Sequence, residues 1–229
     1  MGLFIGNSKE YLSVAETIQL LSTVKQSTTQ SFLFAPRIEA LEASLQEVKG
    51  TGVGIVAQHF AFAGYDCAKL QELGCTGVII GHSSWRAKGI TNEEIAFAVK
   101  AALAHNLIPV VCVGESREVR DNGLTVDFVM AQIHSAFSQL ETDNAKHVIL
   151  AYEPLWAISV NGVGESATNE DVADVLSSIK KEFPHTQVLY GGSVTSTNVS
   201  SFVAQGFDGV LVGKASTISS ELLSLISLV

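Results

Sequence analysis

The amino-acid sequence predicts an α/β protein that folds as a single (β/α)8 barrel over residues 1–229. Three observations favour this fold. Short apolar runs recur eight times, helix-period segments separate most of them, and no linker or low-complexity tract interrupts the alternation. The runs are continuously apolar, as expected for parallel strands covered on both faces. A doubly wound open sheet is the competing fold, but it usually has fewer strands, and no G-x-G-x-x-G follows the first run.

The eight expected strands follow one another at short intervals. They cover residues 2–6, 31–36, 53–58, 77–81, 108–114, 147–153, 187–192 and 208–213. Apolar residues at helical spacing predict amphipathic helices over 14–24, 92–106, 126–140 and 169–183, and an apolar helix over 218–229. Ser13 and Thr91 immediately precede two of these helices and are expected to be their N-caps.

The composition is that of a globular protein with a large core. Hydrophobic residues make up 47% of the 229 residues, charged residues 16%, and the formal net charge is −9. Such an acidic surface argues against non-specific binding to nucleic acid or to anionic membranes. It is compatible with a small anionic substrate, because a local site can oppose the overall field.

Cysteine usage and the apolar runs indicate the compartment. The three cysteines, Cys67, Cys75 and Cys112, are odd in number and form no C-x-x-C pair, so reduced, mostly buried thiols are expected. No run reaches the length needed to span a bilayer, and the apolar start of the chain is too short for a secretory signal. We therefore expect a cytoplasmic protein without membrane contact.

Three ionisable residues follow three of the expected strands. Glu153 ends the sixth run, His82 follows the fourth and Lys9 follows the first. Active sites of (β/α)8 barrels form at the carboxyl ends of the strands, so these side chains are expected to share one pocket. A carboxylate, an imidazole and an ammonium suit proton abstraction next to a carbonyl group and stabilisation of the resulting enediolate. No metal site and no cofactor are expected, because histidines and acids do not cluster at ligand spacing.

Two glycine turns predict a phosphate site. "YGGSV" (190–194) follows the seventh strand and "VGKAS" (212–216) the eighth, and such turns expose backbone N–H groups to an anion. Each residue also has a purely structural interpretation. Glu153 could anchor a loop, His82 could be structural, Lys9 could be a solvated surface lysine, and the glycines could only form tight turns. The joint pattern favours function.

The segments "AYEPLWAI", "GHSSWR", "YGGSV" and "GVLVGKAS" resemble the signature segments of the triosephosphate isomerase family, and the likeness runs from "FIGNSK" to "GKAS". This resemblance implies interconversion of dihydroxyacetone phosphate and D-glyceraldehyde 3-phosphate. It implies Glu153 as the base, His82 as a neutral electrophile and Lys9 as an electrostatic group. It implies a lid over residues 154–166, with its first hinge at 154–156. The implied substrate contacts are Asn7, Ser159, Ser193, Gly213 and the backbone of Lys214.

The sequence departs from the family pattern at specific places. Ser84 replaces an acid that normally sits near the lysine, and Glu10 is one candidate to take its place; Lys214 replaces a glycine, and the lid is longer. The third loop, 57–67, is shorter than the family segment that inserts into the partner subunit. We therefore expect a monomer or a weak, atypical homodimer.

Two other functions stay open on the sequence alone. One is an isomerase of another small phosphorylated sugar, which the altered lid and Lys214 favour. The other is a non-catalytic barrel that binds a phosphorylated ligand, which Ser84 and the short third loop favour. A barrel that only binds a ligand has no need of a base, so the retained acid, histidine and lysine favour the isomerase.

Overall fold

Eight parallel strands pair in sequence order and close on themselves in a computed structural model of the chain, which describes residues 2–60, 65–158 and 166–229. The strands are β1 (Leu3–Asn7), β2 (Phe32–Ala35), β3 (Val53–Ala57), β4 (Gly77–Ile80), β5 (Ile108–Val113), β6 (Ile149–Tyr152), β7 (Gln187–Tyr190) and β8 (Gly209–Val212). The predicted (β/α)8 barrel, a TIM barrel, is confirmed. Each strand agrees with its predicted run to within two residues at either end.

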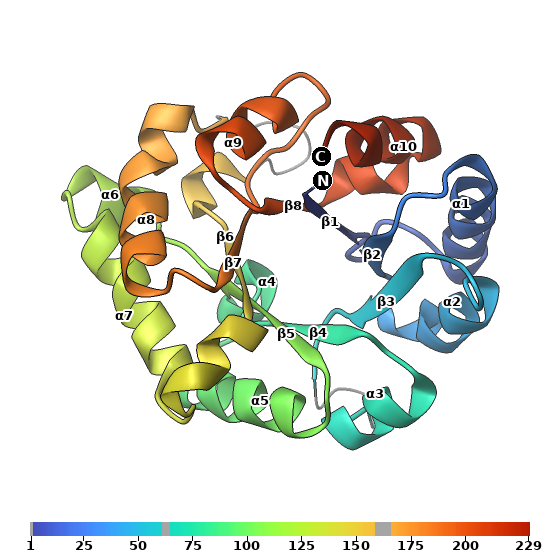
Figure 1. Cartoon of the computed structure of the whole chain (residues 1–229), viewed down its shortest axis with the longest axis horizontal. Helices are drawn as coiled ribbons and strands as arrows, with labels where there is room; N and C mark the ends of the chain where they lie inside the picture. The colour runs from blue at the N-terminus through green and yellow to red at the C-terminus, as the bar shows by residue number, and fades with distance from the viewer. Residues whose placement is uncertain (1, 61–64, 159–165) are drawn as a thin grey trace.

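Helices surround the strands on the outside of the barrel (Figure 1). The α-helices are α1 (Val14–Ser27), α2 (Leu41–Glu47), α3 (Cys67–Leu73), α4 (Ser83–Arg86), α5 (Asn92–Ala104), α6 (Arg117–Asp121), α7 (Thr125–Phe137), α8 (Asn169–Glu182), α9 (Val199–Gln205) and α10 (Ser219–Leu228). The described ranges also contain the 3₁₀ turns η1 (Ile38–Ala40), η2 (Thr142–His147), η3 (Leu155–Ala157) and η4 (Lys214–Thr217).

The predicted N-caps form as the sequence indicates. The Ser13 and Thr91 side chains accept hydrogen bonds from the backbone N–H groups of Glu16 and Glu94, and each glutamate bonds back to the cap. These reciprocal capping boxes satisfy two otherwise unpaired donors at the start of α1 and α5. The end of α5 comes earlier than predicted, because the chain turns away at Asn106, which has a positive φ of 55°.

The core has two layers. One layer fills the barrel interior with residues such as Ile5, Ile79 and Leu189, and the other packs between the strands and the helices. Both faces of each strand are therefore buried, which explains why the strands read as continuous apolar runs rather than as alternating ones.

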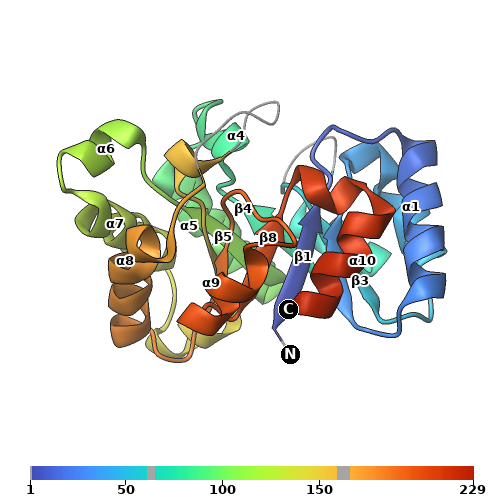
Figure 2. The same ribbon diagram turned by 90° about the horizontal axis from the view of Figure 1, so that it is seen from above.

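The seam between β1 and β8 closes the barrel. Leu3 pairs with Gly209, and the register continues to Gly6 opposite Val212. A Cβ on Gly209 would lie 1.9 Å from the carbonyl oxygen of Leu3, so only glycine permits this approach. Figure 2 shows both chain ends on one side of the barrel, while the β1 arrow points to the opposite side, where α4 lies. The carboxyl ends of the strands, and the residues that follow them, lie on that opposite side.

Candidate active site

The carboxyl ends of β4 and β6 bring His82 and Glu153 together. Both side chains are buried, with 5% and 4% of their surface exposed. His82 Nε2 lies 3.4 Å from Glu153 Oε1, and the backbone N–H of Ser83 donates a long hydrogen bond of 3.4 Å to Glu153 Oε2. The imidazole and the carboxylate therefore face each other across one small space, as the strand ends predicted.

Glycine at the end of β7 makes room for the acid. A Cβ on Gly191 would lie 2.8 Å from Glu153 Cγ, closer than real side chains approach. The glycine pair of "YGGSV" thus has a packing role in addition to its predicted role in anion binding. Beneath the acid, burial and then the nearby Glu153 carboxylate raise the pKa of the Cys112 thiol well above its usual value, so this thiol stays protonated.

The buried position of His82 favours the neutral form of its imidazole. Burial lowers its pKa below the ordinary value; the Glu153 carboxylate opposes this effect and the Lys9 ammonium adds to it. The ring also caps α4, because its Nδ1 accepts a hydrogen bond of 3.3 Å from the backbone N–H of Ser84. The Ser84 hydroxyl lies 2.9 Å from the same nitrogen.

Lys9 has a left-handed backbone, which is uncommon outside glycine. Its φ is 46°, and its N–H donates to Asn7 Oδ1 at 3.0 Å. Gln58 Nε2 donates to the carbonyl oxygens of Lys9 and Ala35, at 3.0 and 3.1 Å. Asn7, predicted as a substrate contact, is therefore also a brace for the lysine. Sequence reasoning missed Gln58, although a polar residue directly after the buried third strand was a usable signal.

The Lys9 ammonium lies beside the loop that follows β8. A Cβ built on Gly213 would lie 3.6 Å from Lys9 Nζ. The candidate replacement for the missing family acid is wrong, because the Glu10 carboxylate pairs with Arg37 at 3.3 Å and not with the lysine. Within the described ranges, no carboxylate forms an ion pair with Lys9.

The predicted phosphate contacts lie in different surroundings, and one of them is not among the described residues. Gly213 precedes η4 next to Lys9, and Lys214 is exposed at the first position of that turn. The N–H and hydroxyl of Ser193 both donate to the carbonyl oxygen of Ala157, at 3.1 and 2.8 Å, which ties the loop after β7 to the start of the predicted lid. Ser159 and most of the predicted lid lie outside the described residues.

The first part of the predicted lid is anchored to a buried acid. Trp156 Nε1 donates to Glu115 Oε1 at 2.6 Å, and the Tyr152 hydroxyl donates to Glu115 Oε2 at 3.1 Å. Burial raises the pKa of Glu115, and these hydrogen bonds oppose that rise. The Arg120 guanidinium lies 4.2 Å from the centre of the Trp156 ring and pairs with Asp171 at the N-terminus of α8. Sequence analysis missed Glu115, although an acid directly after the fifth expected strand was a usable signal.

A cavity of about 290 Å³ lies beside the candidate catalytic residues. Lys9 and His82 form part of its wall, together with Tyr11, Trp85 and Lys88. The His59 ring stacks on Trp85 with centroids 3.6 Å apart, and Lys88 Nζ lies 4.3 Å from the centre of the Trp85 ring. Ser84, the residue that stands where the family has an acid, also lines this cavity.

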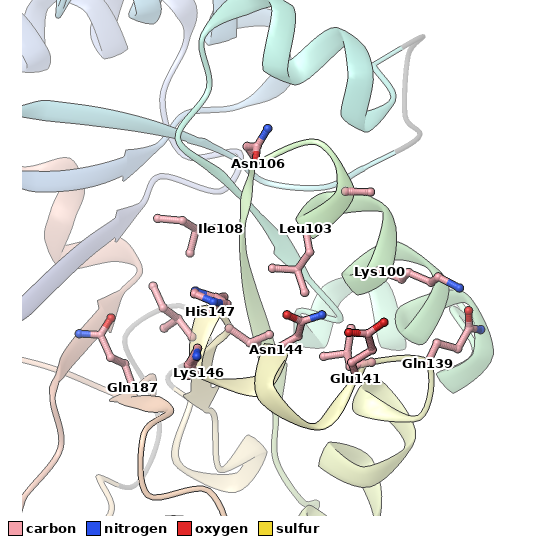
Figure 3. Close-up of a pocket in the computed structure, with 14 residues that line it drawn as sticks. Lys100, Leu103, Asn106, Ile108, Gln139, Glu141, Asn144, Lys146, His147 and Gln187 are labelled. Atoms are coloured by element: carbon pink, nitrogen blue, oxygen red, sulfur yellow. The ribbon is translucent and has the colours of Figure 1, made fainter.

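A larger cavity, of about 760 Å³, lies at the other end of the barrel. Figure 3 shows its lining, which includes Ile108, His147 and Gln187 near the starts of β5, β6 and β7, with Lys100 from α5 and Glu141 before η2. Amino ends of barrel strands normally serve stability rather than catalysis, so this cavity is separate from the candidate active site.

The described part of the chain contains neither a metal-ligand cluster nor a membrane-spanning helix. No group of three or more His, Cys, Asp or Glu side chains there is placed to hold a metal ion. None of the helices in the described ranges combines the length and the apolar character needed to cross a membrane.

Comparison with known proteins places this geometry in a family. Residues 2–229 match the triosephosphate isomerase family. The chain belongs to the triosephosphate isomerase family. It is 34% identical to the triosephosphate isomerase of Roseiflexus sp. (strain RS-1), with 98% of this chain and 96% of the relative covered. It is 33% identical to that of Endomicrobium trichonymphae, with 98% and 97% covered.

The family resemblance and the enzyme class expected from the sequence are confirmed. The members of this family are aldose–ketose isomerases acting on triose phosphates. The alignment with the Roseiflexus triosephosphate isomerase extends over 246 positions, more than the 229 residues of this chain, so it contains gaps on this chain's side. This is consistent with a chain that has lost loop residues relative to its family.

Proposed function

We propose that this chain interconverts dihydroxyacetone phosphate and D-glyceraldehyde 3-phosphate with Glu153 as base, His82 as proton donor and Lys9 as electrostatic group. One observation supports this proposal above the others. The carboxylate and the imidazole face each other at 3.4 Å at the carboxyl ends of β6 and β4 of a triosephosphate isomerase barrel. The ammonium approaches the same region from the end of β1.

The proposed reaction proceeds by proton transfer alone. The Glu153 carboxylate removes the proton from the carbon next to the substrate carbonyl, and the electron pair of that C–H bond forms the enediolate double bond. The Nε2–H of neutral His82 donates to the carbonyl oxygen, and the Lys9 ammonium stabilises the negative charge that develops there. His82 gives its Nε2 proton to the former carbonyl oxygen and takes up the proton of the neighbouring hydroxyl, which regenerates the neutral ring. Glu153 then returns its proton to the former carbonyl carbon, the neighbouring oxygen becomes the new carbonyl, and the isomerisation is complete.

The substrate phosphate is proposed to bind where the loops after β7 and β8 meet. Gly213 and the backbone of Lys214 offer N–H groups, and the Lys9 ammonium lies beside Gly213. Ser193 and Ser159 belong to the same proposal, as does Asn7 on the opposite side of the lysine. A lid over 154–166 would exclude water from the enediolate, which strengthens each electrostatic contact.

The test is a coupled dehydrogenase assay of glyceraldehyde 3-phosphate isomerisation, with Glu153→Gln as the variant. Glutamine keeps the shape of the acid but cannot accept the proton, so we expect kcat to fall by about 10²- to 10⁴-fold. Binding of glycerol 3-phosphate, which has the phosphate but no carbonyl, should persist in the variant. Phosphate binding by the wild type without turnover would support a non-catalytic barrel, and turnover of a longer sugar phosphate only would support the other isomerase.

The same proposal extends to the chain as a whole. Residues 1–229 are proposed to form one domain in the cytoplasm, which is consistent with the single closed sheet and with three buried, unpaired cysteines. The chain is proposed to be a monomer or a weak, atypical homodimer. The shortened third loop supports this, because it is the family segment that normally reaches into the partner subunit.

A further inference from the structure

The contacts on both ring nitrogens of His82 define which nitrogen carries the proton. The backbone N–H of Ser84 points at Nδ1 from 3.3 Å, so Nδ1 must offer a lone pair. At the other side of the ring, Nε2 lies 3.4 Å from the Glu153 carboxylate, where a lone pair would be repelled and an N–H attracted. Both sides of the ring favour the neutral tautomer with hydrogen on Nε2.

This tautomer fixes the direction of the second contact on Nδ1. The Ser84 hydroxyl lies 2.9 Å from Nδ1, and a nitrogen with a lone pair can only accept from it. Ser84 is an exposed residue that lines the adjacent cavity, while His82 is 5% exposed, so the serine lies on the solvent side of the histidine. Nδ1 thus receives hydrogen bonds from two donors of one residue.

We propose that Ser84 is a positioning residue, whose hydroxyl holds His82 in the Nε2–H tautomer and keeps the ring aimed at the substrate oxygen. An acid at this position would have no proton to donate at neutral pH, so its carboxylate could not make this contact. The serine therefore adds a hydrogen bond to the histidine where the resemblance led us to expect only the loss of an acid. This inference rests on the proposed role of His82.

Both donors stabilise the neutral ring, since a hydrogen bond to a lone pair is lost when that nitrogen is protonated. Removal of the hydroxyl should make the ring easier to protonate and less well oriented. The Ser84→Ala variant keeps the backbone N–H and loses only the hydroxyl. The Ser84→Thr variant restores the hydroxyl, and its added methyl has room because position 84 is open to the cavity.

The experiment is ¹⁵N NMR of histidine-labelled protein together with pH profiles of kcat/KM. In the wild type we expect the Nδ1 resonance of His82 to show an unprotonated, hydrogen-bonded nitrogen. In Ser84→Ala this resonance should shift, the acid limb of the profile should move up by about 0.5–1 pH unit, and kcat should fall about three- to tenfold with little change in KM. Ser84→Thr should restore all three.

Two results would overturn the proposal: a wild-type His82 with hydrogen on Nδ1, or an alanine variant whose Nδ1 resonance and acid limb match the wild type. The two readouts also separate this inference from the proposed function. An inactive wild type with an Nδ1 resonance that responds to Ser84→Ala would remove the isomerase and keep the positioning role. An active wild type whose Nδ1 resonance does not respond to Ser84→Ala would keep the isomerase and remove the positioning role.

Discussion

Neighbouring residues hold Lys9 in the candidate site, although its backbone adopts an unfavourable conformation there. A φ of 46° is unfavourable for a residue with a Cβ, and three side-chain hydrogen bonds surround it. Asn7 holds the N–H, while Gln58 holds the carbonyl and the neighbouring Ala35. This bracing holds the lysine beside Gly213, in the loop after the neighbouring strand β8. The sequence predicted the lysine from its place after the first strand, but it did not reveal the strained conformation.

Replacement of this lysine tests its charge. In Lys9→Ala we expect kcat to fall by roughly 10²-fold and KM to rise, because the ammonium would attract the phosphorylated substrate and stabilise the enediolate as well. Steady-state kinetics with varied substrate separate the two effects. Lys100→Ala, which removes an exposed charge from the outside of α5, is the matched control and should be indistinguishable from the wild type. Unaltered kinetics in Lys9→Ala would remove lysine from the mechanism.

Among the elements, the contact between the end of β3 and α4 is the least expected from sequence. His59, just after β3, stacks on Trp85 of α4, and Lys88 lies over the same indole. Burial, and secondarily the nearby Lys88 ammonium, lower the pKa of His59 from 6.5 to about 4, with Glu94 opposing. The native protein therefore holds this imidazole neutral at pH values where an unfolded chain would protonate it.

This linkage predicts how stability depends on pH. Between pH 6.5 and 4 the unfolded state binds a proton at His59 that the folded state does not bind. The contribution of His59 to the free energy of unfolding therefore falls as the pH falls through this window, and it is constant above the window. His59→Phe keeps a ring for stacking and cannot titrate. Between pH 7.5 and 5 the wild type should lose about 1 kcal/mol more than the variant, after allowance for partial exposure. Urea unfolding at both pH values measures this, and equal losses in the two proteins would exclude His59 as the cause.

For the whole molecule, the sequence predicted the fold well because apolar runs and helix-capping residues, the two signals used, are local in the sequence. Continuous apolar runs define strands buried on two faces, and capping residues such as Ser13 and Thr91 define where helices begin. The candidate site was predicted from the order of strand ends. What the sequence could not provide are contacts between distant segments, such as Glu115 with Trp156 or Gln58 with Lys9, since these depend on how the barrel brings its loops together.

The state of association is a property of the whole molecule and is directly measurable. We expect sedimentation or light scattering at micromolar concentration to give a mass near that of one chain, 24.3 kDa, or a mixture that shifts with dilution. The physical reason is the short third loop expected from the sequence, which would leave less surface to bury against a partner. A tight dimer joined through residues 59–66 at this concentration would refute the expectation.

The pairing of β1 with β8 also governs when the protein can first act during its synthesis. Lys9 is translated about 200 residues before Gly213, an interval of roughly 10–40 s at ordinary elongation rates. Until the final strand leaves the ribosome, β1 has an apolar edge without its second neighbour, a surface that invites non-native pairing. Nascent chains therefore need protection at β1 for as long as the strands up to β8 are being made, and the candidate site is complete only after β8 has been made.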